Sequence, residues 1–182
     1  MDLVQMLANA VNNVSAVGIK LILALALVGG LVMLMSHFGN IASRARRGQV
    51  QDGAGKILVV MLICCCVISL HSVMNATSNQ MALGDVTFEA ISYVSEGQYG
   101  PAAVAINAGL TLLQWVGVIY CYMGLLRIRR SQKDGHTGLS AGDDVMKGAK
   151  QLIVGTMLAV NPQVLTALQN TLNIHWSVSY TH

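Results

Sequence analysis

Two short arginine-rich segments contain the residues of this sequence that are best suited to bind a charged ligand. Residues 44–53 read RARRGQVQDG and residues 127–135 read RIRRSQKDG, so nearly the same basic segment occurs twice. Clustered arginines bind phosphate oxygens in pairs, on lipid head groups or on nucleic acid. One basic loop is usually only a solvated turn that sets membrane topology, but two loops with matching sequence favour phosphate contact. The candidate residues are Arg44, Arg46, Arg47, Lys56, Arg127, Arg129, Arg130, Lys133, Lys147 and Lys150.

The other reactive residue types form no catalytic or metal-binding pattern. Residues 53–56 (GAGK) resemble the end of a phosphate-binding loop, but Val50 stands where that motif requires glycine, and Ile57 where it requires serine or threonine. Three consecutive cysteines, residues 64–66, point about 100° apart on a helix and cannot share one metal ion, so we interpret them as small packing residues. The five histidines have no ligand spacing. The sequence therefore predicts no enzyme activity and no metal site.

Apolar residues dominate the chain and occur in long runs. Hydrophobic residues make up 54% of the 182 residues and charged residues 10%, whereas a soluble domain carries about 25% charge. The runs cover 17–38, 57–76, 102–126 and 152–172, and Asn161-Pro162 divides the last of them into two helical pieces. A helix crosses the bilayer core with about 20 apolar residues, and no run alternates like a barrel strand. We predict an all-α fold with four hydrophobic membrane helices, arranged as two tandem helical hairpins.

Two shorter amphipathic helices are predicted outside these runs, at the N-terminus over 3–14 and between the hairpins over 81–96. The predicted organisation is a first hairpin with its N-terminal helix at 1–76, an acidic connector at 77–101, and a second hairpin with a longer basic loop and a C-terminal tail at 102–182. The first 19 residues contain no lysine or arginine, so we expect the first apolar run to be retained rather than cleaved as a signal peptide.

Glycines inside the apolar runs predict where helices approach one another. Small residues allow close packing in lipid, where van der Waals contact rather than the hydrophobic effect holds helices together. The candidate packing residues are Gly29, Gly30, Gly109, Gly117 and Gly124.

The charge distribution predicts the orientation in the membrane. The first loop has four basic residues and Asp52, and the second has six basic residues and three aspartates, so each sums to +3. The connector carries Asp85, Glu89 and Glu96 without a basic residue and sums to −3. Because lysine and arginine collect in cytoplasmic loops, loops 39–56 and 127–150 are predicted in the cytoplasm. Both termini and the connector are then periplasmic.

The order of apolar helix, basic turn and apolar helix resembles the pilins of conjugative type IV secretion systems. Over nearly its full length, the chain looks more like the TraQ-type transfer proteins of I-type conjugative plasmids and the DotE/IcmC proteins of type IVB secretion. The resemblance implies insertion in a bacterial inner membrane and assembly into an extracellular helical homo-oligomer, with other secretion-system proteins as partners. It also implies a phospholipid bound by each subunit and basic turns that line a lumen, through which single-stranded DNA passes without sequence-specific binding. No other cofactor is expected.

The chain departs from ordinary pilins in two ways: it has two hairpins rather than one, and it has no evident signal peptide. Other functions therefore stay open. The first alternative is a non-polymerising inner-membrane component of the same transfer apparatus, which binds partners through its cytoplasmic loops. The second is a small channel or holin. Apart from Lys20 near the outer end of the first run, the apolar runs contain no charged residue, which counts against this second alternative because transport paths usually contain intramembrane charge.

Overall fold

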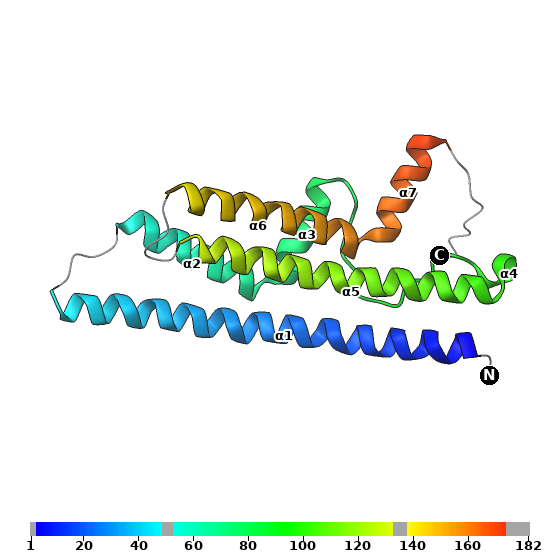
Figure 1. Cartoon of the computed structure of the whole chain (residues 1–182), viewed down its shortest axis with the longest axis horizontal. Coiled ribbons are helices and arrows are strands. Elements are labelled where there is room, and N and C mark those ends of the chain that lie inside the picture. Colours follow the sequence, from blue (N-terminus) through cyan, green and yellow to red (C-terminus); the bar gives the residue numbers. More distant parts are fainter. Residues whose placement is uncertain (1–2, 49–52, 133–137, 174–182) are drawn as a thin grey trace.

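The computed structural model describes residues 3–48, 53–132 and 138–173, and these form six helices of at least eleven residues and one single-turn helix. No described residue belongs to a strand, so the all-α prediction is confirmed (Figure 1). The helices are α1 (Leu3–Arg46), α2 (Ala54–Ile68), α3 (Leu70–Gln80), α4 (Glu96–Tyr99), α5 (Pro101–Arg130), α6 (Gly138–Ala159) and α7 (Asn161–Leu172).

The long helices lie side by side along one axis (Figure 1). α1 packs with α2, α5 packs with α6, and contact between α1 and α5 joins the two pairs. α1 and α5 run in the same direction, and both end toward the same end of the molecule. One hydrophobic core unites the elements, with Ile19 of α1, Val67 of α2, Met74 of α3, Val118 of α5 and Ala159 of α6 among its members.

The lengths and compositions of the helices are consistent with insertion in a membrane. α1 and α5 are each long and apolar enough to cross a bilayer, and the count rises to four if each of two bent helix pairs forms one crossing. α1 leaves large apolar side chains uncovered along its middle, with Leu21 58% exposed, Val28 56% and Met35 72%. Such a surface is suited to hydrocarbon rather than to water.

Two sharp bends interrupt the apolar runs, and only the second coincides with a helix break predicted from the sequence. α2 and α3 meet at 91°, and α6 and α7 meet at 84°. The helix break predicted at Asn161-Pro162 is confirmed, with Pro162 in the first turn of α7. The bend at Ser69 has no proline. There the Ser69 backbone leaves helical values (φ −99°, ψ 40°), and the serine hydroxyl donates a 2.8 Å hydrogen bond to the Cys65 carbonyl.

The helix predicted over 81–96 is wrong. Residues 83–95 are not helical, and only the single turn α4 forms at the end of that segment. Ala82 and Gly84 have positive φ values of 55° and 84°, which turn the chain out of α3. Val86 and Tyr93 are then buried at 3% and 7% exposure. The apolar residues of the connector therefore pack on the bundle instead of lying on a membrane surface.

The amphipathic N-terminal segment is helical but does not form a separate element. Residues 3–14 continue without a break into the apolar run, so one helix of 44 residues contains both. At 1.5 Å per residue α1 is about 66 Å long, roughly twice the thickness of the hydrocarbon core of a bilayer.

Candidate phosphate-binding end

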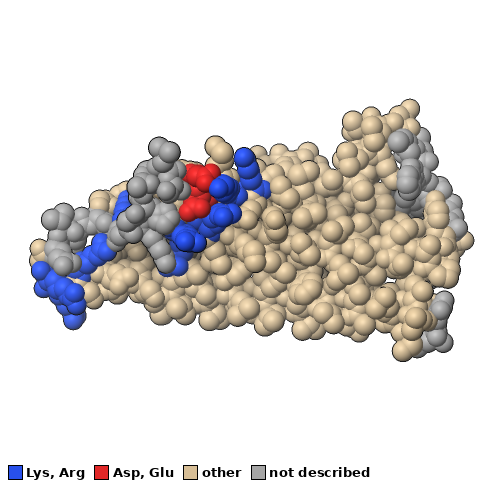
Figure 2. All heavy atoms as spheres, in the orientation of Figure 1, with Lys and Arg blue, Asp and Glu red and all other residues tan. Residues whose placement is uncertain are grey.

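The candidate basic residues that the structure describes all lie toward one end of the long axis, which we call the basic end. They occupy the last turns of α1 and α5, the turn after α1, the first turn of α2 and the middle of α6 (Figure 2). The described members are Arg44, Arg46, Arg47, Lys56, Arg127, Arg129, Arg130, Lys147 and Lys150. Lys133 lies outside the described residues. The opposite half of the face seen in Figure 2 has no charged side chain among its described residues.

The basic end has two levels along the long axis. The outer level is formed by the arginines at the end of α1, and the inner level by those at the end of α5. A Cβ at Gly29 of α1 would lie 3.4 Å from the Tyr122 hydroxyl of α5, which aligns the two helices. From there Arg44 is fifteen residues further along α1, whereas Arg127 is only five residues further along α5. The difference of ten residues places the α1 arginines roughly 15 Å beyond those of α5. Figure 1 shows the same offset, because α1 extends past the end of α5.

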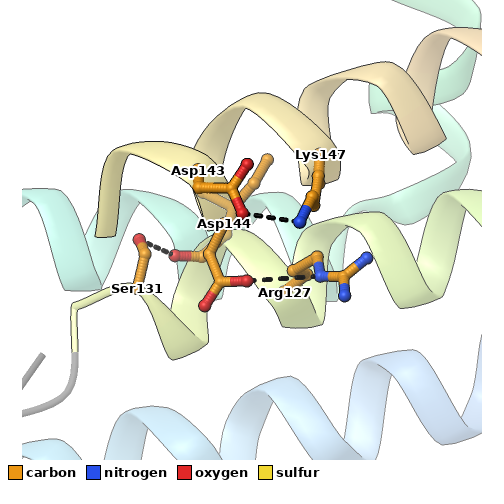
Figure 3. A network of polar contacts seen from close by, with 6 residues as sticks. Arg127, Ser131, Asp143, Asp144 and Lys147 are labelled. Atoms are coloured by element: carbon orange, nitrogen blue, oxygen red, sulfur yellow. Dashed lines mark hydrogen bonds and ion pairs between the residues drawn. The ribbon is translucent and has the colours of Figure 1, made fainter. Parts of the chain in front are cut away.

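Two acidic side chains of α6 lie beside basic residues of the inner level. Arg127 Nε lies 3.4 Å from Asp144 Oδ1, and Lys147 Nζ lies 2.5 Å from Asp143 Oδ2 (Figure 3). These four side chains are between 21% and 56% exposed, so each pair contributes about 0–1 kcal/mol to stability. Their main effect is on charge, since the aspartates offset part of the positive potential that would attract phosphate.

This balance gives a first prediction. Changing Asp143 and Asp144 together to asparagine raises the second loop from +3 to +5. We expect the purified double variant to retain more anionic phospholipid than the wild type, by about twofold or more, because lipid phosphates meet less competing negative charge. Lipid mass spectrometry measures this. The matched control is Asp85→Asn in the connector, and an equal gain in that variant would show that only overall charge matters.

A close approach of α5 and α6 holds the inner level in place. Cβ atoms at Gly117 and Gly124 of α5 would lie 2.6 Å and 2.8 Å from backbone atoms of α6. Gly155 and Gly148 of α6 face them, and a Cβ at either would come within 2.7 Å of α5 backbone. In each helix the two glycines are seven residues apart, so they fall on one face over two turns.

The other predicted packing glycines differ from one another. A Cβ at Gly30 would lie 2.6 Å from the Ile68 side chain of α2, so Gly30 lies in the contact between α1 and α2. Gly29 faces the Tyr122 hydroxyl at an ordinary distance. Gly109 has no atom within 4 Å of its Cβ position, and it is exposed. Gly18, which the sequence analysis did not select, lies against the Trp115 indole of α5.

Side-chain amides fix the connector to the bundle. Asn107 Oδ1 accepts hydrogen bonds from the backbone N–H groups of Tyr93 and Val94 at 3.0 Å and 2.9 Å, and its Nδ2 donates to the Val94 carbonyl at 2.9 Å. Asn75 Oδ1 accepts from the Val86 N–H at 2.7 Å. Gln114 Nε2 donates to the Thr87 carbonyl. These groups replace the backbone partners that a helix would have supplied.

Sequence reasoning missed Asn75, Asn107 and Gln114, as well as Gly148 and Gly155. The seven-residue spacing of Gly148 and Gly155 repeats that of Gly117 and Gly124 and was a usable signal. The amides had a weaker signal. They are uncharged polar residues in or beside apolar runs, where an unpaired amide is costly and a partner is therefore expected.

Comparison of the chain with known protein families, curated proteins and solved structures finds no match. In the residues that the structure describes, the fold defines the class of an all-helical protein with two to four helices long and apolar enough to cross a membrane. Any assignment beyond that class rests on the geometry of the basic end and of the helices that hold it.

Proposed function

We propose that the chain is a pilin-like structural subunit of a conjugative type IV secretion pilus, which binds phospholipid at its basic end. One observation carries the proposal: apolar helices pack in pairs that are flanked by two basic segments, and the described arginines and lysines of both segments lie toward the same end of the molecule. Topology alone requires positive charge but does not require nearly the same arginine sequence in each loop.

The proposed topology has four membrane crossings. α1 and α5 run in the same direction (Figure 1), so if both cross the bilayer, the chain between them must return to the starting side. α2, α3 and the connector then make that return, with backbone groups of the connector paired to Asn75, Asn107 and Gln114. Non-helical backbone at membrane depth is tolerated only when protein covers and satisfies it in this way. The basic end faces the cytoplasm before assembly, and the connector ends on the periplasmic side, where α5 begins.

In the proposed filament the basic end lines a lumen, and lipid phosphates occupy its arginines. Arg46 and Arg47 are exposed at the outer level, where guanidinium groups can bind phosphate oxygens in pairs. Lipid tails then cover apolar side chains that water would otherwise contact. Since the lumen charge is partly neutralised by phosphate, single-stranded DNA passes without sequence-specific binding.

Removal of the outer arginines tests the lipid role. We expect Arg46→Ala with Arg47→Ala to lower co-purified phospholipid by at least half, because two bidentate phosphate ligands are lost. Phosphorus analysis and lipid mass spectrometry of detergent-purified protein measure the ratio of lipid to protein. Lys20→Ala is the control, since it removes an exposed cation on the same helix far from the basic end. Unchanged lipid content in the double variant would remove phosphate binding from the proposal.

A non-polymerising inner-membrane component of the same apparatus is the second candidate, and the two bends favour it. α3 and α7 turn by 91° and 84° from the helices they follow, so the subunit is wider than a pair of straight hairpins, which would pack more simply into a filament. Electron microscopy of the sheared cell-surface fraction separates the two functions. Helical filaments that contain this chain support the pilin, and the chain retained only in inner membranes supports the component.

A further inference from the structure

An apolar seam runs the whole length of α1 on the face opposite the bundle. Its members recur at alternating intervals of three and four residues and are all exposed. We call this set the α1 seam: Leu3, Leu7, Ala10, Val14, Val17, Leu21, Ala24, Val28, Leu31, Met35, Phe38 and Ala42. The residues of α1 buried against the rest of the chain are different ones, namely Ala8, Ser15, Ile19, Ala26 and Gly30.

Lipid alone does not explain a seam of this length. α1 is about 66 Å long, and the hydrocarbon core covers about 30 Å of it. The middle of the helix, from Val17 to Met35, suffices to cross that core. The seam nevertheless continues through Leu3, Leu7 and Val14 on one side, where other positions of the helix are polar (Gln5, Asn9, Asn12 and Asn13). Because α1 is one unbroken helix, this end cannot lie flat on the bilayer while its middle crosses it.

The spacing identifies the kind of partner. Apolar residues at alternating steps of three and four are the a and d positions of a coiled coil, in which two helices cross at a small angle. Val14, Leu21 and Val28 stand at successive a positions, and Val17 and Leu31 stand at d positions. Among the flanking positions of this pattern only Lys20 is charged, so the seam contains no charge pattern that would select an oppositely charged foreign helix.

The area available is close to what a stable interface needs. Nine large seam residues are between 42% and 80% exposed, and Met6, Leu25, Leu27 and Val32 beside them are between 46% and 57% exposed. At about 100 Å² for each fully exposed large apolar side chain, these groups offer roughly 700 Å² per subunit. A standard interface buries about 800 Å² on each partner.

We propose that α1 self-associates through its seam with α1 of a second copy of this chain, in parallel orientation. Copies inserted in one membrane share one orientation, so the two basic ends come together and phosphate groups of lipid can screen their repulsion. This goes beyond the proposed function, because the pairing forms in a detergent-solubilised or membrane-embedded protein whether or not a filament is made. In a filament the same seam is the contact between neighbouring subunits.

Cysteine crosslinking of the full chain tests the seam directly. The four native cysteines, residues 64, 65, 66 and 121, are first changed to alanine, and single cysteines are placed at Leu7 and Val14. A parallel coiled coil brings equivalent a positions together, so mild oxidation in membranes is expected to convert most of each variant to a dimer. The matched controls are Asn9→Cys and Ala16→Cys, which are exposed on the same helix but off the seam, and we expect at least fivefold less dimer there.

Charge variants at the same level provide a second readout. Leu7→Glu with Val14→Glu places like charges across the seam outside the apolar middle of α1, so the wild-type dimer or larger oligomer is expected to become a monomer in detergent by light scattering. Asn9→Glu with Ala16→Glu keeps the wild-type mass. A monomeric wild type, or equal crosslinking on and off the seam, overturns the proposal and leaves lipid or another protein as the occupant. Lipid content of the same samples distinguishes this failure from failure of phosphate binding at Arg46 and Arg47.

Discussion

Changing Gly117 to alanine is expected to weaken the association of α5 with α6 by about 2–3 kcal/mol. The added methyl group would lie 2.6 Å from the Ala159 nitrogen and from the Gly155 carbonyl oxygen. Both neighbours are backbone atoms of α6, so neither can rotate away as a flexible side chain would. The helices must separate, and the packing lost around Cys121 and Thr156 adds to the cost. We expect the thermal midpoint in detergent to fall by about 5–10 °C.

Gly109→Ala is the matched control, because it makes the same chemical change in the same helix. No atom lies within 4 Å of the Cβ position there, and alanine is a better helix former than glycine by up to about 1 kcal/mol. The thermal midpoint of this variant should therefore stay unchanged or rise. Equal midpoints for the two variants would contradict the close approach of α5 and α6. Gly155→Ala, whose methyl would lie 2.7 Å from the Cys121 nitrogen, should behave like Gly117→Ala.

The helical class and the placement of charge followed from the sequence because both depend on local composition. Long apolar runs with 10% charged residues overall require helices if they enter a bilayer, and arginines at the ends of two such runs must lie at helix ends. These features do not depend on which helix packs against which. The helix break at Pro162 could be predicted for the same reason.

The bend at Ser69 and the path of the connector could not be predicted. The connector's path depends on contacts between residues distant in the sequence. Residues 81–96 have a helical pattern of apolar side chains, but Asn75, Asn107 and Gln114 offer the backbone other partners from other helices. Local pattern gives no information about such competition. The bend at Ser69 likewise has no proline or glycine to mark it in an otherwise continuous apolar run, although the Ser69 backbone leaves helical values there (φ −99°, ψ 40°).

The two levels of the basic end also depend on contacts between residues that are distant in the sequence. The matching arginine segments suggest equivalent positions, but the stagger between α1 and α5 is set by Gly18 against Trp115 and by Gly29 against Tyr122. A small residue in one helix receives a large aromatic side chain of the other, and this register moves the first loop beyond the second. The sequence contained both glycines and both aromatics without indicating how they pair.

Changing Asn107 to leucine is expected to release the connector while leaving α5 intact. The side chain keeps a similar size but loses three hydrogen bonds to the backbone of Tyr93 and Val94. Leaving partly buried backbone groups without partners costs about 1–3 kcal/mol. Each 1.4 kcal/mol is tenfold in an equilibrium constant, so a loss near 2–3 kcal/mol should speed amide exchange of Tyr93 and Val94 about 30- to 100-fold. Hydrogen–deuterium exchange in detergent measures this, and peptides from the middle of α5 serve as the internal reference.

Two further variants make this test specific to the connector. Asn79→Leu removes an amide that bonds only to the exposed Asp85 carboxylate, at 3.0 Å, so exchange at residues 93 and 94 should not change. Asn107→Asp keeps an oxygen that accepts from both N–H groups and loses only the donor to the Val94 carbonyl, so its effect should be intermediate. If Asn107→Leu exchanges like the wild type, burial of Val86 and Tyr93 rather than the asparagine holds the connector. The proposed return of the chain across the membrane would then need another source of partners for its backbone.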